Sequence, residues 1–376
     1  MSSQKRIVIK VGTSTLTNDN GNPNPEYIRT LAADVQELTT QGLSPILVSS
    51  GAIAAGMQAL KLHGRPRTIP QKQAAAAVGQ GLLMHLYSTA FESLGLTVAQ
   101  MLLTKDDLID RKRYINASNT LNALLKLNAI PIINENDTIA VNEIRVGDND
   151  TLAAMVAGLA DASALVILSD VDGLYTENPL ENPDAELIRV VKRIDRRIEA
   201  LAGEAGTTRG TGGMRTKINA AKICARSAVT MYIANGKQSR VIQRSLAGEI
   251  GSKFLPSTAV QLKSKKRWIA FGSASSGTVT INPGATRQII YGGKSLLPAG
   301  IIDVTGAFAM GDMVLVNDEA GTPVARGIVN YSAESLRLIM GKQSTAIEET
   351  LGIAGPDEAV HRDNLVLTGQ VLEARS

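Results

Sequence analysis

Short apolar runs alternate with helical stretches over about the first 250 residues of the chain. Six runs rich in β-branched residues are the expected strands, at residues 6–11, 44–50, 97–103, 129–135, 164–170 and 229–235. The expected helices between them include residues 26–41, 71–94, 116–127, 150–160 and 214–226. Strands that alternate with helices form βαβ units around a parallel sheet. The pattern therefore predicts an α/β fold with a largely parallel central sheet, whose ligands bind where the strands end.

The pattern changes after residues 253–268. From there on, short alternating runs are separated by Gly, Pro and Asp, as in GTVTINPGA and GDMVLVNDEAGTPVARGIVNYS. Such runs are typical of a small β-rich barrel or sandwich. We therefore expect a first domain at residues 1–258, a linker at 259–274, and a β-rich domain with a C-terminal tail at 275–376.

The composition, 44% hydrophobic and 20% charged, indicates a folded chain with substantial cores. The single cysteine, Cys224, excludes an intrachain disulfide and fits a reducing compartment. The chain shows neither an N-terminal apolar segment nor an apolar run long enough to span a membrane. These features predict a cytoplasmic protein without a membrane partner.

The charge is distributed unevenly along the chain. Residues 1–263 carry 29 Lys and Arg against 24 Asp and Glu, whereas residues 264–376 carry 10 against 11. The basic excess lies in the first part, where an anionic small molecule could use it. The second part lacks the positive charge of a nucleic-acid-binding domain, and aromatic residues make up only 3% of the chain. RNA is therefore a disfavoured partner.

Two turns that follow predicted strands have the composition of anion-binding loops. Lys10 ends the first apolar run and precedes Gly12-Thr13-Ser14, and Ser50-Gly51 follows the second run and opens an alanine-rich helix. Backbone amides at such turns can bind a phosphate, and the lysine adds a positive charge. The alternatives are an ordinary turn with a surface lysine and a capped helix packed on the sheet.

Acids and amides gather in the motifs INENDTI (133–139) and VGDNDTLAA (146–154). They are Asn134, Asp137, Asp148, Asn149 and Asp150. Asp137 could pair with an ammonium group, and Asp148 and Asp150 could orient lysines or a magnesium ion. The alternative is turn and helix-cap chemistry, which Asp150 in particular would fit.

Two further motifs fit a nucleotide. The run LSDVDGLY (168–175) is an apolar strand that ends in Ser169-Asp170, and GTGGMRTK (210–217) is a glycine-rich opening of a helix. Glycines let the backbone approach phosphates, and Lys217 could neutralise charge on a transferred phosphoryl group. The alternative for residues 203–213 is a surface loop.

In this order, the motifs of residues 7–16, 48–56, 133–139, 146–154, 168–175 and 210–217 resemble those of the amino acid kinase family, over residues 5 to about 255. The C-terminal part, with SLLPAGI, GD at 311–312 and ARGIVNYS, resembles a PUA domain. The resemblance implies an amino acid kinase-like sandwich with helices on both faces of the sheet, followed by a small PUA-like domain.

Within the family, the chain is most similar to members that phosphorylate the γ-carboxylate of L-glutamate at the start of proline biosynthesis. The resemblance implies ATP and Mg²⁺ as cofactors, feedback inhibition by proline, and a homo-oligomer, either a dimer or a tetramer. It also suggests glutamyl-phosphate reductase as a partner that receives the labile product. Family members that act on aspartate, N-acetylglutamate, carbamate or UMP are the first alternative, and an RNA-binding protein is the less favoured second one.

The resemblance also implies a role for each motif residue. Lys10 and Lys217 flank the transferred phosphoryl group, Asp150 holds them in place, and Asp148 assists. The glutamate set is Ser50, Gly51, Asn134, Asp137 and Asn149. The nucleotide set is Lys10, Gly12, Thr13, Ser169, Asp170, Thr211, Gly212, Gly213, Met214, Arg215, Thr216 and Lys217. Magnesium is expected on the ATP phosphates, mostly through water and phosphate oxygens, so no protein ligand is assigned to it.

Overall fold

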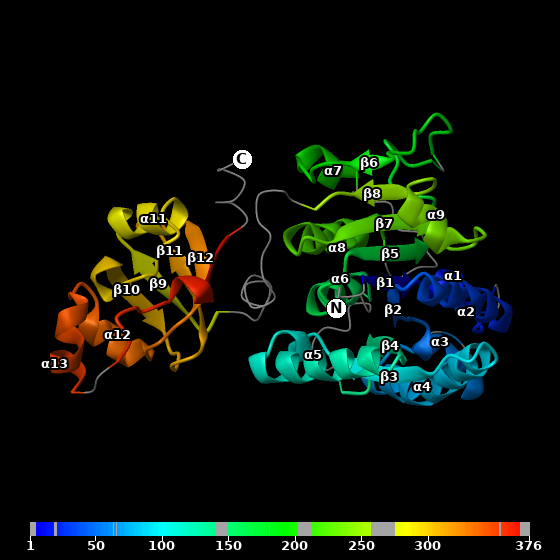
Figure 1. Ribbon diagram of the computed structural model, residues 1–376, viewed down its shortest axis with the longest axis horizontal. Helices are drawn as coiled ribbons and strands as arrows, with labels where there is room; N and C mark the ends of the chain where they lie inside the picture. Colours follow the sequence, from blue (N-terminus) through cyan, green and yellow to red (C-terminus); the bar gives the residue numbers. More distant parts are fainter. Residues whose placement is uncertain are drawn as a thin grey trace. The chain divides into compact units, whose positions relative to one another are not determined.

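The computed structural model describes residues 5–18, 21–62, 64, 66–139, 149–179, 181–201, 213–256, 275–352 and 355–368. The chain divides into two compact units, residues 1–261 and 262–376, and each is described by itself (Figure 1). The expected linker at residues 259–274 lies outside the described residues. Among the described helices, none combines the length and the apolar character that crossing a membrane requires.

The first unit is built on an eight-stranded sheet with the order β3-β4-β2-β1-β5-β7-β8-β6. The strands are β1 (Arg6–Val11), β2 (Ser44–Val48), β3 (Val98–Leu103), β4 (Ile130–Glu135), β5 (Ala164–Ser169), β6 (Val190–Val191), β7 (Thr230–Asn235) and β8 (Ser252–Phe254). Every neighbouring pair is parallel except β7 and β8. The predicted α/β fold with a largely parallel sheet is confirmed.

The helices of this unit are α1 (Thr13–Leu16), α2 (Pro25–Thr40), α3 (Ala52–Ala59), α4 (Ile69–Glu92), α5 (Arg111–Lys126), α6 (Asn149–Leu159), α7 (Arg196–Leu201), α8 (Met214–Arg226) and α9 (Val241–Ala247), with a short 3₁₀ turn, η1 (Asp106–Leu108). Local sequence sets several of their starts. Asn24 caps α2 by accepting hydrogen bonds from the backbone of the first turn, and Thr68 and Gln71 form a capping box at α4.

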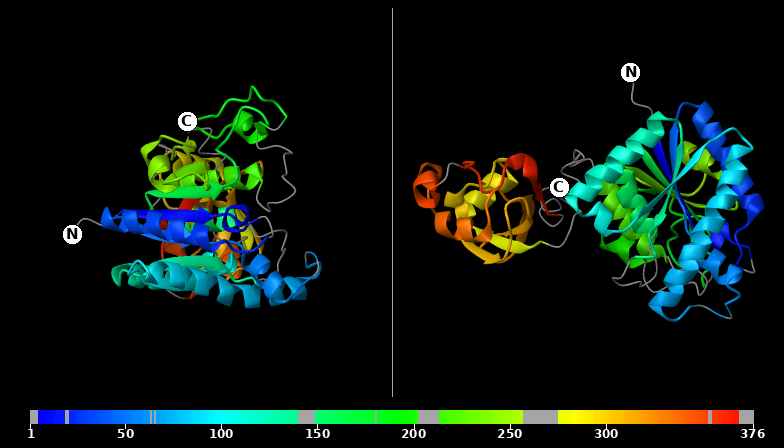
Figure 2. Two further views of the ribbon diagram at one scale, coloured as in Figure 1. Left: turned by 90° about the vertical axis from the view of Figure 1, so that its right-hand side faces the viewer. Right: turned by 90° about the horizontal axis from the view of Figure 1, so that it is seen from below.

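Alternate residues of the central strand pack on opposite faces of the sheet. Val8 lies in a core with residues of α5, α6 and α8, whereas Ile7, Ile9 and Val11 lie in a second core with residues of α2, α4 and α9. This is the period of two that a strand imposes on its side chains. Helices therefore cover both faces of the sheet, as Figure 2 shows.

Lys10 continues the series that contains Val8, so it points to the face covered by α6 and α8. Both of these helices lead back into a parallel strand, α6 into β5 and α8 into β7, so their first turns lie at the carboxyl edge of the sheet. Lys10 ends at the same edge, one residue before the end of β1. The topology thus brings the motif of residues 7–16 to the first turns of α6 and α8.

The second unit has a five-stranded sheet with the order β10-β9-β11-β12-β13. Its elements are β9 (Gly277–Ile281), α11 (Pro283–Ile290), η2 (Pro298–Gly300), β10 (Ile301–Gly306), β11 (Met313–Asn317), β12 (Pro323–Ile328), α12 (Ala333–Ile339), η3 (Ser344–Ala346), α13 (Ile347–Leu351), η4 (Arg362–Asn364) and β13 (Leu365–Leu367). β9 and β11 are parallel, and the other pairs are antiparallel. The expected small β-rich domain is confirmed.

Candidate active site

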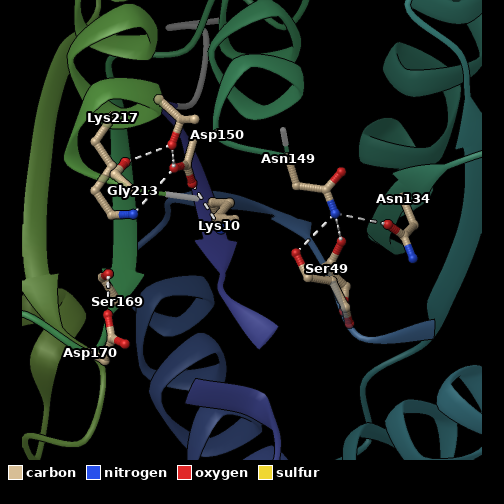
Figure 3. Close-up of polar contacts among 11 residues, drawn as sticks. Lys10, Ser49, Asn134, Asn149, Asp150, Ser169, Asp170, Gly213 and Lys217 are labelled. Atoms are coloured by element: carbon tan, nitrogen blue, oxygen red, sulfur yellow. Dashed lines mark hydrogen bonds and ion pairs between the residues drawn. The ribbon is translucent and has the colours of Figure 1, made fainter. Parts of the chain in front are cut away.

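Lys10, Asp150 and Lys217 form a buried cluster of ion pairs (Figure 3). Lys10 Nζ lies 2.8 Å from Asp150 Oδ1, and Lys217 Nζ lies 3.3 Å from Asp150 Oδ2. The three side chains come from β1, α6 and α8, and only 7%, 1% and 4% of these residues is exposed. One carboxylate therefore holds two ammonium groups, and the cluster carries one net positive charge.

The cluster keeps Asp150 ionised. Burial alone would raise the pKa of its carboxyl, but the charges of Lys10 and Lys217, with hydrogen bonds from Lys10 and Thr216, outweigh burial and hold the pKa well below its usual range. The negative charge is therefore fixed at neutral pH, and the cluster keeps its net positive charge.

Thr216 ties this cluster to the start of α8. Its Oγ1 lies 2.7 Å from Asp150 Oδ2 and 2.8 Å from the carbonyl oxygen of Gly213, the residue that caps the helix. The hydroxyl has one proton and two acceptors, so it holds the carboxylate against the first turn of α8. Lys217 follows in that turn.

The glycine turn after β1 lies directly against Lys10. Gly12 donates its backbone N–H to the carbonyl oxygen of Leu168 on β5, and a Cβ at Gly12 would lie 3.6 Å from Lys10 Nζ. Gly51, which caps α3, has a φ of +91° and lies near Leu16 and Thr13 of α1. The two turns predicted to bind anions are thus neighbours, and Gly51 requires the left-handed backbone that glycine adopts without strain.

Asn149 organises a second cluster beside the first. Its Nδ2 lies 2.8 Å from the carbonyl oxygen of Ser49, 2.9 Å from Ser50 Oγ and 3.1 Å from Asn134 Oδ1 (Figure 3). These contacts orient its amide oxygen Oδ1, which is buried and has no hydrogen-bond partner among the residues that the structure describes. A buried amide oxygen of this kind favours a donor from a ligand.

Asp137 lies in the turn after β4 and is half-buried. Burial and, to a smaller extent, the nearby charge of Glu135 raise the pKa of Asp137 to about 7. A carboxylate in this situation gains from a cationic partner, because the partner would offset both causes of the shift.

The described residues of the predicted nucleotide set lie around these clusters. Ser169 is buried at the end of β5, and its Oγ lies 3.1 Å from a carboxylate oxygen of the exposed Asp170. Gly213 and Met214 are half-buried, and Arg215 is exposed on α8. Three predicted site residues, Asp148, Thr211 and Gly212, lie outside the described residues. Within the described ranges, no group of three or more His, Cys, Asp or Glu side chains is placed to hold a metal ion.

A family model for the amino acid kinase family matches residues 5–235, and a model for the PUA domain matches residues 277–351. The chain belongs to the amino acid kinase family. The resemblance that its six motifs carry is thus confirmed, together with the PUA domain in the second unit.

Curated relatives in the family match almost the whole chain. A protein of Caldanaerobacter subterraneus subsp. tengcongensis named Glutamate 5-kinase is 51% identical over 363 residues, which cover 96% of this chain and 97% of the relative. A Glutamate 5-kinase of Moorella thermoacetica is 50% identical over 370 residues, which cover 98% of both chains. Both units of this chain therefore have counterparts in these proteins.

Among solved structures, carbamate kinase from Giardia lamblia bound to AMP-PNP is similar with a TM-score of 0.52 and 18% identity. It covers 68% of this chain and 100% of its own. At this identity, the likeness shows the amino acid kinase fold alone.

The sequence motifs contained most of the residues that the structure brings together, but not all. The carbonyl oxygen of Ser49 accepts a hydrogen bond from Asn149. Two residues of α4 contact neighbouring groups: Tyr87 contacts the hydroxyl of Ser49, and Gln80 contacts the carbonyl oxygen of Glu135. Ser49 lies within the motif of residues 48–56 but was not among the predicted site residues, so its place could have been inferred. Gln80 and Tyr87 lie in an alanine-rich helix without a motif, and no sequence signal marks them.

Proposed function

We propose that the chain phosphorylates the γ-carboxylate of L-glutamate with ATP, giving L-glutamyl 5-phosphate and ADP. The observation that carries the proposal is the pair Asn149 and Asp150 in the first turn of α6. Consecutive residues of a helix point about 100° apart, so one residue reaches the polar cluster of β2 and β4 while the other reaches the two lysines. An acceptor site and a phosphate site therefore share one helix start, as phosphoryl transfer between two bound substrates requires. The name of the curated relatives, Glutamate 5-kinase, supports glutamate as the acceptor.

The chemistry suits a site built on lysines. A carboxylate acceptor is ionised at neutral pH, so the enzyme needs no general base to create the nucleophile. The carboxylate oxygen forms a bond to the γ-phosphorus while the bond from that phosphorus to the β,γ-bridging oxygen of ATP breaks, and ADP leaves with the bond's electrons. Lys10 and Lys217 offset the repulsion between the two anions and the charge on the phosphoryl oxygens, because both are buried and fixed by Asp150.

The second cluster fits the amino-acid end of glutamate. We assign Ser50, Gly51, Asn134, Asp137 and Asn149 to this substrate. Asp137 is the partner for the α-ammonium group, since a cation there would offset its burial and the charge of Glu135. Oδ1 of Asn149, which has no hydrogen-bond partner among the described residues, offers a further acceptor for substrate N–H groups.

The nucleotide set fits ATP by charge and position. The net positive charge of the lysine cluster matches the triphosphate, and we assign Ser169, Asp170 and residues 211–217 to the nucleotide. Magnesium on the triphosphate oxygens would neutralise part of the phosphate charge, chiefly through water and phosphate ligands. This chain's residues orient the phosphates and exclude water around the lysines.

The first test is a hydroxamate assay with purified full-length protein, ATP, magnesium, hydroxylamine and a panel of acceptors. Glutamate should give hydroxamate well above an enzyme-free control, and Lys10→Ala and Lys217→Ala should each lose most of the turnover. The panel also contains aspartate and N-acetylglutamate, and ADP release reports on carbamate and UMP. Turnover with one of these acceptors and none with glutamate would replace the proposal by a related kinase.

For the second unit we propose a regulatory or assembly role. A surface cavity of about 690 Å³ on this unit is lined by side chains of both charges: Lys294 and Arg362 are basic, and Glu358 is acidic. RNA binding would need a more uniformly positive surface. A chain that ends near residue 270 should retain glutamate phosphorylation. Its complete loss in a folded truncation would contradict this role, and tRNA gel shifts at physiological salt would detect an RNA-binding one.

We also propose inhibition by proline, assembly into a dimer or tetramer, and transfer of the acyl phosphate to glutamyl-phosphate reductase. All three are carried over from the family resemblance of the sequence motifs. Rate measurements with proline, light scattering and coupled assays with the reductase test them separately.

A further inference from the structure

Helix α4 buries two polar side chains on one face. Gln80 is 7% exposed and Tyr87 is fully buried, in a helix of 24 residues. Residues seven apart lie on the same side of a helix, two turns from each other. Each of the two contacts the backbone or a side chain next to the proposed glutamate residues.

Tyr87 supports the turn after β2. Ser49 Oγ donates to the carbonyl oxygen of Ser50 at 3.2 Å, which uses the only proton of the serine hydroxyl. The contact of 3.0 Å between Tyr87 Oη and Ser49 Oγ is therefore donated by the tyrosine. Burial, partly offset by the hydrogen bond with Ser49, raises the pKa of Tyr87 to about 12, so the phenol keeps the proton that it donates. This chain of hydrogen bonds fixes the carbonyl group of Ser50.

Gln80 supports the end of β4. Its Nε2 donates to the carbonyl oxygen of Glu135 at 3.4 Å, and its Oε1 accepts from Gln100 Nε2 of β3 at 3.3 Å. The backbone N–H of Glu135 in turn donates to Asn134 Oδ1 at 2.9 Å. Gln80 thus holds the residue whose N–H orients Asn134, one of the three groups that Asn149 contacts.

The same stretch of α4 is locked against α3. A Cβ at Gly79 would lie 1.7 Å from the carbonyl oxygen of Ala52, and a Cβ at Gly56 would lie 1.7 Å from that of Ala75. The two helices therefore cross with their backbones in contact, which only glycine allows. Gly51, which caps α3, is fixed to α4 by this crossing.

We propose that Gln80 and Tyr87 are positioning residues for the glutamate acceptor, since they hold the turn of Ser49-Ser50 and the Asn134 end of β4 at a fixed separation. The inference rests on the proposed function. Among the described residues, neither side chain forms a hydrogen bond with the Lys10–Asp150–Lys217 cluster. Their loss should therefore affect the binding of the acceptor and leave the phosphoryl-transfer step in place.

The test uses Tyr87→Phe and Gln80→Met in the full chain, with hydroxamate kinetics at varied glutamate and varied ATP. Each variant should raise KM for glutamate about two- to tenfold, the effect of about one net hydrogen bond. We expect kcat to stay within about twofold and KM for ATP to stay unchanged. If one variant fails to fold, the other carries the test.

Two control variants remove a glutamine amide and a tyrosine hydroxyl at positions away from the candidate site. Gln36→Met removes a helix glutamine that also donates to a backbone carbonyl, that of Leu94 at 3.0 Å, away from the site. Tyr291→Phe removes the hydroxyl of an exposed tyrosine in the second unit. Both controls should leave KM for glutamate unchanged.

The outcomes separate this inference from the function on which it rests. An unmodified chain that forms no glutamyl hydroxamate overturns both. An active chain whose two variants keep the normal KM for glutamate, or lose kcat and raise KM for ATP as much as KM for glutamate, overturns the positioning role alone.

Discussion

Replacing Asp150 by asparagine tests the charge balance of the lysine cluster. The substitution keeps the shape of the side chain but removes the charge that both Lys10 and Lys217 contact, at 2.8 and 3.3 Å. The net buried charge of the cluster changes from +1 to +2. Removing one partner of a buried ion pair costs about 3–5 kcal/mol, because the remaining charge is left without compensation.

This magnitude translates into a large thermal shift. For a domain of this size, 1 kcal/mol changes Tm by about 2–4 °C, so Asp150→Asn should lower Tm by about 6–20 °C. Turnover should fall about 100- to 1,000-fold, since in the proposed mechanism the lysines lose the group that fixes them beside the phosphoryl oxygens. Differential scanning fluorimetry and the hydroxamate assay measure the two effects on the same preparation.

The nucleotide provides an internal check. A cluster of charge +2 binds a triphosphate more strongly than one of charge +1, so saturating ATP should raise Tm more in Asp150→Asn than in the unmodified chain. Thr216→Val is the matched control, because it removes the 2.7 Å hydrogen bond to Asp150 without changing the charge. It should cost only about 1 kcal/mol.

A second substitution separates stability from catalysis. Adding Lys10→Met to Asp150→Asn returns the net charge to +1, which should recover part of the lost Tm and none of the turnover. The reasoning is refuted if Asp150→Asn alone keeps its Tm within about 2 °C and its turnover within about threefold of the unmodified chain, effects far below those expected for a buried charge.

Three further predictions follow from single features. The pKa of Asp137, raised to about 7 by burial and by Glu135, predicts that KM for glutamate falls as pH rises from 6 to 8, and a pH-independent KM would contradict the ammonium role. The stability of the free protein should fall as pH rises from about 4 to 7, since the folded state keeps the proton of Asp137 to a higher pH than the unfolded state. Burial raises the pKa of the Cys224 thiol, so iodoacetamide at pH 8 should label it only after denaturation, and rapid labelling of the native protein would show that it is accessible. Gly56→Ala should lower the free energy of unfolding by about 1–3 kcal/mol or more, seen as a lower urea midpoint, because its Cβ would meet a carbonyl oxygen at 1.7 Å. Gly81→Ala on α4, where a Cβ meets nothing within 4 Å, should be neutral or stabilising, and equal effects would argue against the close helix crossing.

The elements of the first unit could be predicted closely from the sequence. The second predicted strand, residues 44–50, is Ser44–Val48 in the structure, and the helix expected at 214–226 has those bounds. Among the predicted elements, the largest difference in bounds is at α5, expected from residue 116 and observed from Arg111. Its first turn is polar and offers no apolar period, and its start is set by Asp110, which caps it by accepting from the backbone of Arg113. The short strands β6 and β8 were not predicted.

The residues of the candidate site could be listed from the sequence, but their geometry could not. Motif order placed Lys10, Asp150 and Lys217 together through the family resemblance, although 67 residues separate even the nearer pair. Both lysines share one carboxylate because of the strand order, in which β1 lies between β2 and β5. The periodicity of the sequence does not reveal this order. The support from Gln80 and Tyr87 depends on the rotation of α4 about its axis, and a helix of low amphipathicity leaves that rotation undefined.

The start of α6 also has a consequence for redesign. Because Asn149 and Asp150 contact different clusters, the proposed function assigns the choice of acceptor and the handling of phosphate to separate groups of side chains on one helix. An engineer who wishes to change the acceptor can vary the residues around Asn149 on β2 and β4 and leave β1 and α8 untouched. Substitutions around this one helix turn could therefore adapt the site to acceptors of different size and charge.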